Sequence, residues 1–314
     1  MADPAKVELS GAFPHRGAMR GRRGAAAADH PLAAQAGMAV LREGGSAADA
    51  AVAMGAVMVV VQPQYSHLGG DGFAMVWHQA TRAVSALNSA GPAPRSLDVE
   101  SYRSLGHIPV HGPPAVTLPG AVAGWWALHQ RYGKLPWKRL FEDAIEYARG
   151  GFPASRGLAR ALASVGHESR AGFPFDVETG QRVVQEPLAR TLEAIAAAGQ
   201  DAFYGGAIAQ ACRDRLAAGG ATFSADEWRS PALWLDPVAG DYQGHRVWAS
   251  PPQTQGFVLP LALALTPQPP LPTSRERGSD VRSVAMYEAL RVALGIRERE
   301  LSDPDVTGFD PRAY

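Results

Sequence analysis

The stretch LREGGSAADAAVA, residues 41–53, places the end of one helix and the start of the next within a few residues. Upstream of it, apolar residues recur at helical spacing over residues 30–41. The glycine pair at 44–45 is typical of a helix C-terminus, and Ser46 is typical of an N-cap. The second helix, expected over residues 47–61, is apolar on nearly every side, so other elements must enclose it.

Outward from this stretch, apolar runs and glycine-rich turns predict both helices and strands. Two short runs should form a hairpin, residues 73–77 and 83–87. A turn at Gln243-Gly244 predicts a second pair of strands, residues 236–242 and 245–249. The sequence also predicts helices over residues 121–132, 140–149, 188–198, 207–218, 256–265 and 281–300, with an exposed loop at 266–280. The residues alone therefore indicate an α/β or α+β fold.

The composition is that of a globular chain able to bury a large core. Of its 314 residues, 46% are hydrophobic and 19% are charged. Lysine plus arginine equals aspartate plus glutamate at 30 each, so no overall field attracts nucleic acid or an acidic membrane surface. The single Cys212 excludes an internal disulfide, and its helical context favours a buried structural thiol over a nucleophile.

The N-terminal residues predict a flexible lead-in followed by one structured region. Residues 1–27 are rich in Arg, Gly and Ala and carry no visible secretion signal. The longest apolar run, residues 47–61, is interrupted by Asp49 and is shorter than the roughly 20 residues that cross a bilayer. We therefore expect a cytoplasmic protein with no membrane partner, structured over residues 28–314.

Motifs for several common chemistries are missing from the sequence. The glycine-rich residues 68–73 lack the lysine and hydroxyl residue of a P-loop, so their glycines fit a close approach to backbone or ligand. No Gly-x-Ser-x-Gly segment of a serine hydrolase occurs. A metal site is not expected, because the histidines considered lie on different elements. These are His67, His78, His107, His111 and His129.

Nine segments, in order, resemble the γ-glutamyltransferase family. They cover most of the chain between residues 28 and 305, and their order and spacing make chance an improbable explanation. The segments are HPLAAQAG (30–37), LREGGSAADAAVA (41–53), LGGDGF (68–73), LPGAVAGW (118–125), YGKLPW (132–137), ARGGF (148–152), FYGG (203–206), GDYQG (240–244) and SPP (250–252).

The resemblance implies an α+β fold of the N-terminal-nucleophile hydrolase type, a four-layer αββα sandwich that this chain would fill only in part. Such enzymes are made as one precursor that cleaves itself into a large and a small subunit. The new N-terminal threonine of the small subunit attacks an amide carbonyl, and water or an acceptor amine then takes the acyl group. The chemistry requires no cofactor, and the implied partners are a small-molecule amide or γ-glutamyl substrate and a small-subunit polypeptide.

The nucleophile of the family has no counterpart here. It lies in a Thr-Thr-His or Thr-Ser-His motif downstream of the helix that matches residues 281–300, and no such motif occurs in this sequence. Thr307 is the only late threonine, and too few residues follow it to form a small subunit. We therefore expect this chain to be the large-subunit portion, inactive alone, with its catalytic threonine outside it.

The substrate-binding residues also depart from the family. True γ-glutamyl enzymes place an arginine shortly before an Ala-Pro pair, where it clamps the α-carboxylate of the donor, and Ala90 stands at that position here. Arg95 could substitute, although an ordinary surface arginine is the simpler interpretation. Asn88 and Ser89 could offer neutral hydrogen bonds to an acyl group, or could form only a turn.

Three functional hypotheses follow from the resemblance. The first is γ-glutamyl transfer or glutathione hydrolysis by a family enzyme. The second is a related amidohydrolase or acylase acting on an amide without a γ-glutamyl group. The third is a non-catalytic descendant that keeps the fold as a binding module.

Overall fold

The computed structural model describes residues 21–164, 177–229, 232–266 and 280–313. Its helices are α1 (Pro31–Arg42), α2 (Ala47–Val61), α3 (Val99–Leu105), α4 (Ala121–Tyr132), α5 (Glu142–Gly150), α6 (Arg156–Ser164), α7 (Glu186–Ala198), α8 (Asp201–Tyr204), α9 (Gly206–Ala218), α10 (Val258–Leu265), α11 (Asp280–Glu300) and α12 (Pro304–Thr307). Its strands are β1 (Gly72–His78), β2 (Ala83–Ser89), β3 (Phe152–Pro153), β4 (Arg182–Val183), β5 (Leu233–Leu235), β6 (Val238–Tyr242) and β7 (His245–Ala249).

The junction between α1 and α2 forms as the opening sequence stretch predicts. Gly44 adopts φ +91°, which a residue with a side chain rarely does, and this ends α1. Ser46 and Asp49 then form a capping box at the start of α2: the Asp49 backbone N–H donates to Ser46 Oγ over 3.0 Å, and the Ser46 backbone N–H donates to Asp49 Oδ2 over 2.8 Å. As expected, α2 spans residues 47–61, and most of its residues are buried.

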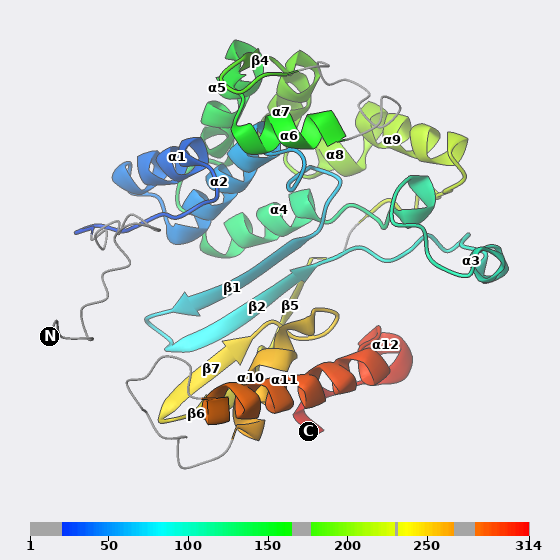
Figure 1. The fold of residues 1–314 in the computed structure, drawn as a ribbon. Helices are drawn as coiled ribbons and strands as arrows, with labels where there is room; N and C mark the ends of the chain where they lie inside the picture. The colour runs from blue at the N-terminus through cyan, green and yellow to red at the C-terminus, as the bar shows by residue number, and fades with distance from the viewer. Residues whose placement is uncertain (1–20, 165–176, 230–231, 267–279, 314) are drawn as a thin grey trace, which may run out of the picture.

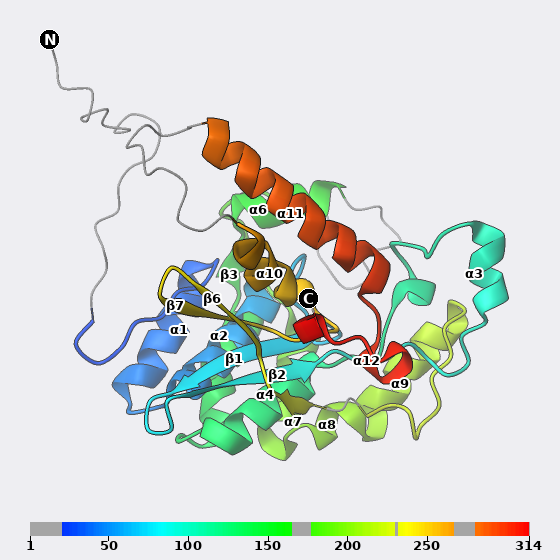
Figure 2. The ribbon, with the colours of Figure 1, turned by 90° about the horizontal axis from the view of Figure 1, so that it is seen from below.

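The elements stack in four layers, which confirms the expected α+β sandwich (Figure 1). Helices α1, α2, α4, α5 and α7 cover one face of the sheet β1-β2-β5. The hairpin β6-β7 lies on the opposite side of that sheet, and α10 and α11 lie beyond the hairpin. Figure 2 shows the same order from below, with α11 nearest the viewer.

The two faces of the β1-β2 ribbon have different surroundings. Its antiparallel register pairs Gly72 with Ser89 and His78 with Ala83. Alternate side chains, among them Ala74 and Leu87, pack into the main core under the helices. On the other face, three large apolar side chains remain half exposed: Phe73 at 49%, Met75 at 40% and Trp77 at 46%.

Several details differ from the sequence-based expectations. The helix expected over residues 140–149 is a 3₁₀ turn, Trp137–Phe141, that continues into α5. The helix expected from residue 256 likewise starts as a 3₁₀ turn, Gln255–Phe257, before α10. The shortest elements, such as β3 and β4 with two residues each, are too brief to produce a readable period. Most of the expected loop at 266–280 lies outside the described residues, as do residues 1–20 of the lead-in.

Within the described segments, no helix combines the length and apolar character needed to span a bilayer.

Candidate functional site

The ends of β1 and β2 meet the N-terminus of α4. The backbone N–H groups of Gly120 and Ala121 both donate to the Gly70 carbonyl oxygen over 2.8 Å, so the glycine-rich loop before β1 caps this helix. From β2, Ser89 Oγ donates to the Gly120 carbonyl oxygen over 2.7 Å. The backbone of the glycine-rich loop therefore contacts the start of α4 directly, in agreement with the expectation that these glycines allow a close approach to backbone or ligand.

Glycines allow this junction to be tight. A Cβ on Gly91 would lie 1.8 Å from the Leu118 carbonyl oxygen, and the Leu118 N–H donates to the Pro92 carbonyl oxygen over 2.9 Å. A Cβ on Gly124 would lie 3.1 Å from Ser89 Cβ. Because backbone touches backbone here, only glycine fits at residue 91 without a shift of the chain.

Tyr204 also fixes the start of α4, through two hydrogen bonds of its hydroxyl. Its hydroxyl donates to the Pro119 carbonyl oxygen over 2.8 Å and accepts the Ala123 N–H over 3.2 Å. Burial raises the pKa of this phenol above its ordinary value, so the hydroxyl keeps its proton as a donor. Tyr204, which belongs to the FYGG segment, therefore positions the start of α4.

The three candidate binding residues separate onto two faces of β2. Asn88 is 5% exposed and points to the side of the β6-β7 hairpin, whereas Ser89 is fully buried against α4. The Ala90 N–H donates to Asn88 Oδ1 over 2.9 Å. The structure thus brings Asn88 and Ala90 together and does not bring the Ser89 hydroxyl to the same side.

Gln253 joins this group, although the sequence did not single it out. Asn88 Nδ2 donates to Gln253 Oε1 over 3.3 Å, which fixes the orientation of the Asn88 amide. Gln253 directly follows the SPP segment at residues 250–252. Its position directly after the SPP segment is the feature of the sequence that could have pointed to Gln253, but no pattern in the sequence links residue 253 to residue 88.

Asp71 is the charged group at this end of the ribbon. Desolvation by the surrounding atoms raises the pKa of the Asp71 carboxyl above its ordinary value, although the residue as a whole is exposed, while the Gly91 backbone N–H and nearby His67 act in the opposite direction. Continuing the β1-β2 register by one residue beyond Gly72 and Ser89 places Asp71 opposite Ala90. The sequence analysis quoted this aspartate within the glycine-rich segment but assigned it no role.

Arg95 does not turn toward Ala90. Its guanidinium Nη1 forms an ion pair with Asp226 Oδ2 at 3.0 Å, and its backbone N–H donates to Glu227 Oε1 over 2.6 Å. The Arg95 side chain is 75% exposed. These contacts support the interpretation of Arg95 as a surface residue that fastens its loop to residues 226–227.

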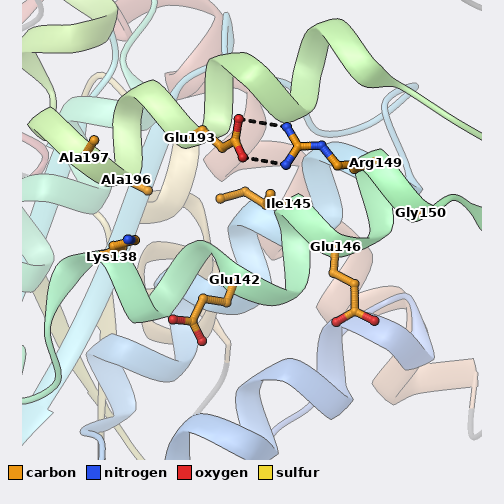
Figure 3. A pocket seen from close by; sticks show the side chains of 9 residues that line it. All are labelled: Lys138, Glu142, Ile145, Glu146, Arg149, Gly150, Glu193, Ala196 and Ala197. Atoms are coloured by element: carbon orange, nitrogen blue, oxygen red, sulfur yellow. Dashed lines mark hydrogen bonds and ion pairs between the residues drawn. The ribbon is translucent and has the colours of Figure 1, made fainter.

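A groove on the outer face of the helical layer, between α5 and α7, is a second candidate. It has a volume of about 660 Å³. In Figure 3, Ile145 points from α5 toward α7, and Arg149 spans the groove to Glu193. The residues that line it are Lys138, Glu142, Ile145, Glu146, Arg149, Gly150, Glu193, Ala196 and Ala197.

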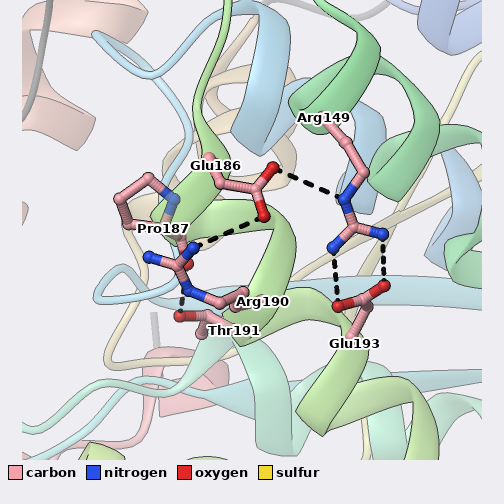
Figure 4. Close-up of polar contacts among 6 residues, drawn as sticks. All are labelled: Arg149, Glu186, Pro187, Arg190, Thr191 and Glu193. Carbon is pink, nitrogen blue, oxygen red and sulfur yellow. Dashed lines mark hydrogen bonds and ion pairs between the residues drawn. The ribbon is translucent and has the colours of Figure 1, made fainter.

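The charges in this groove serve to join its two helices. Arg149 on α5 contacts Glu193 through Nη1 over 2.6 Å and Glu186 through Nε over 3.4 Å, and Glu186 also pairs with Arg190 (Figure 4). Charge-assisted hydrogen bonds from Arg149 lower the pKa of Glu193. Because these carboxylates are satisfied by neighbouring arginines and the groove is open, it offers no arrangement suited to catalysis.

No grouping of three or more potential metal ligands occurs within the described ranges. Thr307, the late threonine, lies at the end of α12, where its hydroxyl donates to the Asp303 carbonyl oxygen over 3.3 Å. This contact belongs to an ordinary helical turn.

Comparison with known proteins identifies relatives over nearly the whole chain. A glutathione hydrolase-like proenzyme of Bacillus subtilis strain 168 is 36% identical over 287 residues, which cover 88% of this chain and 54% of the relative. An oxamate amidohydrolase proenzyme of Klebsiella pneumoniae is 34% identical over 299 residues, which cover 90% of this chain and 56% of the relative. The chain therefore spans about half the length of these curated relatives.

Solved structures agree with the sequence comparison. The crystal structure of Helicobacter pylori γ-glutamyltranspeptidase matches with a TM-score of 0.88 and 28% identity, covering 94% of this chain and 89% of that one. The sequence model of the γ-glutamyltranspeptidase family matches residues 33–311. With four layers, the capped α4 junction and these matches in place, the chain belongs to the γ-glutamyltranspeptidase family.

Proposed function

We propose that this chain is the large-subunit portion of an amide hydrolase or acyltransferase that acts on γ-glutamyl amides, glutathione among them. The observation that carries the proposal is membership of the γ-glutamyltranspeptidase family over residues 33–311. The relatives named as proenzymes extend well beyond the matched half. The nucleophilic threonine then belongs to polypeptide outside this chain and attacks the donor carbonyl to form an acyl-enzyme.

The half-open sheet supports a second polypeptide as partner. Strand β1 lies at the edge of the order β1-β2-β5, so one side of its backbone has no neighbouring strand within the described residues. Beside that edge, Phe73, Met75 and Trp77 are each 40% exposed or more. An unpaired edge next to an apolar face favours association with further strands.

The donor's acyl group would lie beside Asn88 and Ala90. Asn88 lies near the end of β2 on the face toward the second sheet, Ala90 follows the strand directly, and Gln253 holds the Asn88 amide. No arginine supplies a carboxylate clamp at residue 90, and Arg95 is paired with Asp226. The lack of an arginine at residue 90 keeps a second candidate open, an amidohydrolase acting on an acyl group without an α-carboxylate.

The test is reconstitution of activity with the polypeptide that follows or accompanies this chain. We expect the combined protein to cleave itself ahead of a threonine, which mass spectrometry of the two products would show, and then to release p-nitroaniline from γ-glutamyl p-nitroanilide. Substitution of that threonine by alanine should abolish both events. The matched control is Thr307→Ala, which should leave both unchanged because Thr307 makes a local helical contact.

Two other outcomes separate the alternatives. Release of p-nitroaniline from a neutral acyl p-nitroanilide, but not from γ-glutamyl p-nitroanilide, would favour the amidohydrolase. Self-cleavage and amide hydrolysis that both fail in the combined protein would contradict the enzyme proposal and favour the binding module.

A further inference from the structure

Asp71 directly precedes β1, next to the end of β2 where the candidate acyl-binding residues Asn88 and Ala90 lie. Side chains two residues apart on a strand share a face, and residues directly opposite one another on paired strands also share it. Phe73 pairs with Asn88 in the register, and continuing this alternation by one residue past the strand ends at Gly72 and Ser89 puts Asp71 and Ala90 on the face that carries Asn88. The Gly91 backbone N–H, which acts on the Asp71 carboxyl, ties the aspartate to the chain directly after Ala90.

The charge of Asp71 has no fixed counterion. Within the described ranges, no lysine or arginine forms an ion pair with it, and His67 is the nearby basic side chain that acts on its pKa. The neighbouring candidate groups, the Asn88 and Gln253 amides and the Ala90 methyl group, are neutral. A ligand bound against this face therefore meets one negative charge that no lysine or arginine among the described residues neutralises.

We infer that Asp71 determines the charge preference of the acyl site, which accepts acyl groups of zero or positive net charge and disfavours acyl groups of net negative charge. The inference rests on the proposed function, because it assumes that the donor's acyl group lies beside Asn88 and Ala90. Its physical basis is Coulomb repulsion near the protein surface, where the effective dielectric constant is still below that of bulk water. Such repulsion is on the order of a tenfold effect on binding at separations of several ångströms.

Two donors that differ by one amino group test the preference in the reconstituted enzyme. The acyl part of γ-glutamyl p-nitroanilide carries an ammonium and a carboxylate, so its net charge is zero. Glutaryl p-nitroanilide lacks the ammonium and is negative. We expect Asp71→Asn to lower the ratio of kcat/KM for the γ-glutamyl donor to that for the glutaryl donor by about tenfold, mainly through KM.

Asp71→Asn is a conservative variant, since the asparagine oxygen can still accept the Gly91 N–H. Glu146→Gln is the matched control, because it removes one negative charge from α5, on the outer helical layer (Figure 3), and should leave the ratio unchanged. Raising the salt concentration should reduce the wild-type ratio toward that of Asp71→Asn, which a merely structural role would not produce. Where glutaryl cleavage is slow, the inhibition constant of the glutaryl compound replaces its kcat/KM.

An Asp71→Asn ratio within about twofold of the wild-type ratio, with the γ-glutamyl donor still cleaved, would overturn this inference and leave the proposed function intact. Failure of the unmodified enzyme to cleave any amide would overturn the proposed function and this inference with it.

Discussion

At the scale of single residues, Asp49 shows how a buried carboxylate organises two distant segments. It is fully buried, and its Oδ2 accepts three backbone N–H groups: Ser46 at 2.8 Å, Lys134 at 2.8 Å and Leu135 at 3.2 Å. The YGKLPW segment is thereby fastened to the N-terminus of α2. Asp49 Oδ1 has no hydrogen-bond partner within the described chain, and His129 Nε2 lies 3.9 Å away.

Asp49→Ala should therefore be strongly destabilising. It leaves three backbone donors without an acceptor, and we expect the free energy of unfolding to fall by roughly 3–5 kcal/mol. Asp49→Asn can place its oxygen at the Oδ2 position and its amide nitrogen at the unpaired Oδ1 position, so it should lose roughly 1–2 kcal/mol. Chemical denaturation of the reconstituted protein measures both, and equal losses in the two variants would contradict this explanation.

At the scale of elements, the backbone contact between the end of β2 and the segment before α4 positions the candidate site. Gly91 approaches the Leu118 carbonyl oxygen where any Cβ would collide with it, and the same two segments are joined by the hydrogen bond between Leu118 and Pro92. The colliding atoms would be a Cβ, whose position the backbone fixes, and a backbone carbonyl oxygen. No change of side-chain rotamer can therefore relieve the collision.

Gly91→Ala should accordingly separate β2 from α4. We expect a loss of about 3 kcal/mol or more in the free energy of unfolding, together with reduced amidase activity, because Asn88 and Ala90 would move with the strand end. Gly295→Ala, in the interior of α11 with no close contact except the flexible end of Arg299, should instead stabilise by roughly 0.5–1 kcal/mol. Thermal unfolding of both variants compares them directly. A Gly91→Ala protein as stable as the wild type would show that the contact is easily displaced.

At the scale of the whole molecule, the second sheet within the described residues is only the hairpin β6-β7, and it leaves apolar side chains around it exposed. The hairpin β6-β7 contacts the larger sheet through Trp77 and Trp248, whose ring centroids are 6.0 Å apart. Apolar side chains on α10 and α11 also remain exposed, among them Leu259 at 55% and Tyr287 at 64%. This surface is more extensive than the scattered apolar residues of an ordinary monomer.

The chain expressed alone should therefore aggregate or unfold without a sharp transition, whereas co-expression with its partner polypeptide should yield a soluble, cooperatively melting complex. Size-exclusion chromatography and thermal unfolding measure the two properties. A monomeric isolated chain with a sharp cooperative transition would contradict the view that this surface is an interface.

Local patterns in the sequence determined the secondary structure near the site. The glycine pair at 44–45, the Ser46 cap and the apolar run of residues 47–61 fix α2 because helix capping and a continuous apolar run are local signals that act over a few residues. The hairpin of β1 and β2 was predicted for the same reason, although its second strand continues two residues further, to Ser89. The order of the family segments predicted the layered fold.

Only the tertiary structure decided what the side chains at the end of β2 do. The extension of that strand sends Asn88 and Ser89 to opposite faces, Gln253 reaches Asn88 from 165 residues away, and Asp226 holds Arg95 from 131 residues away. Such contacts leave no period or spacing in the sequence, because they depend on how distant elements pack. The sequence by itself thus determined most of the longer elements and the family resemblance, and packing determined which polar groups face the candidate acyl site.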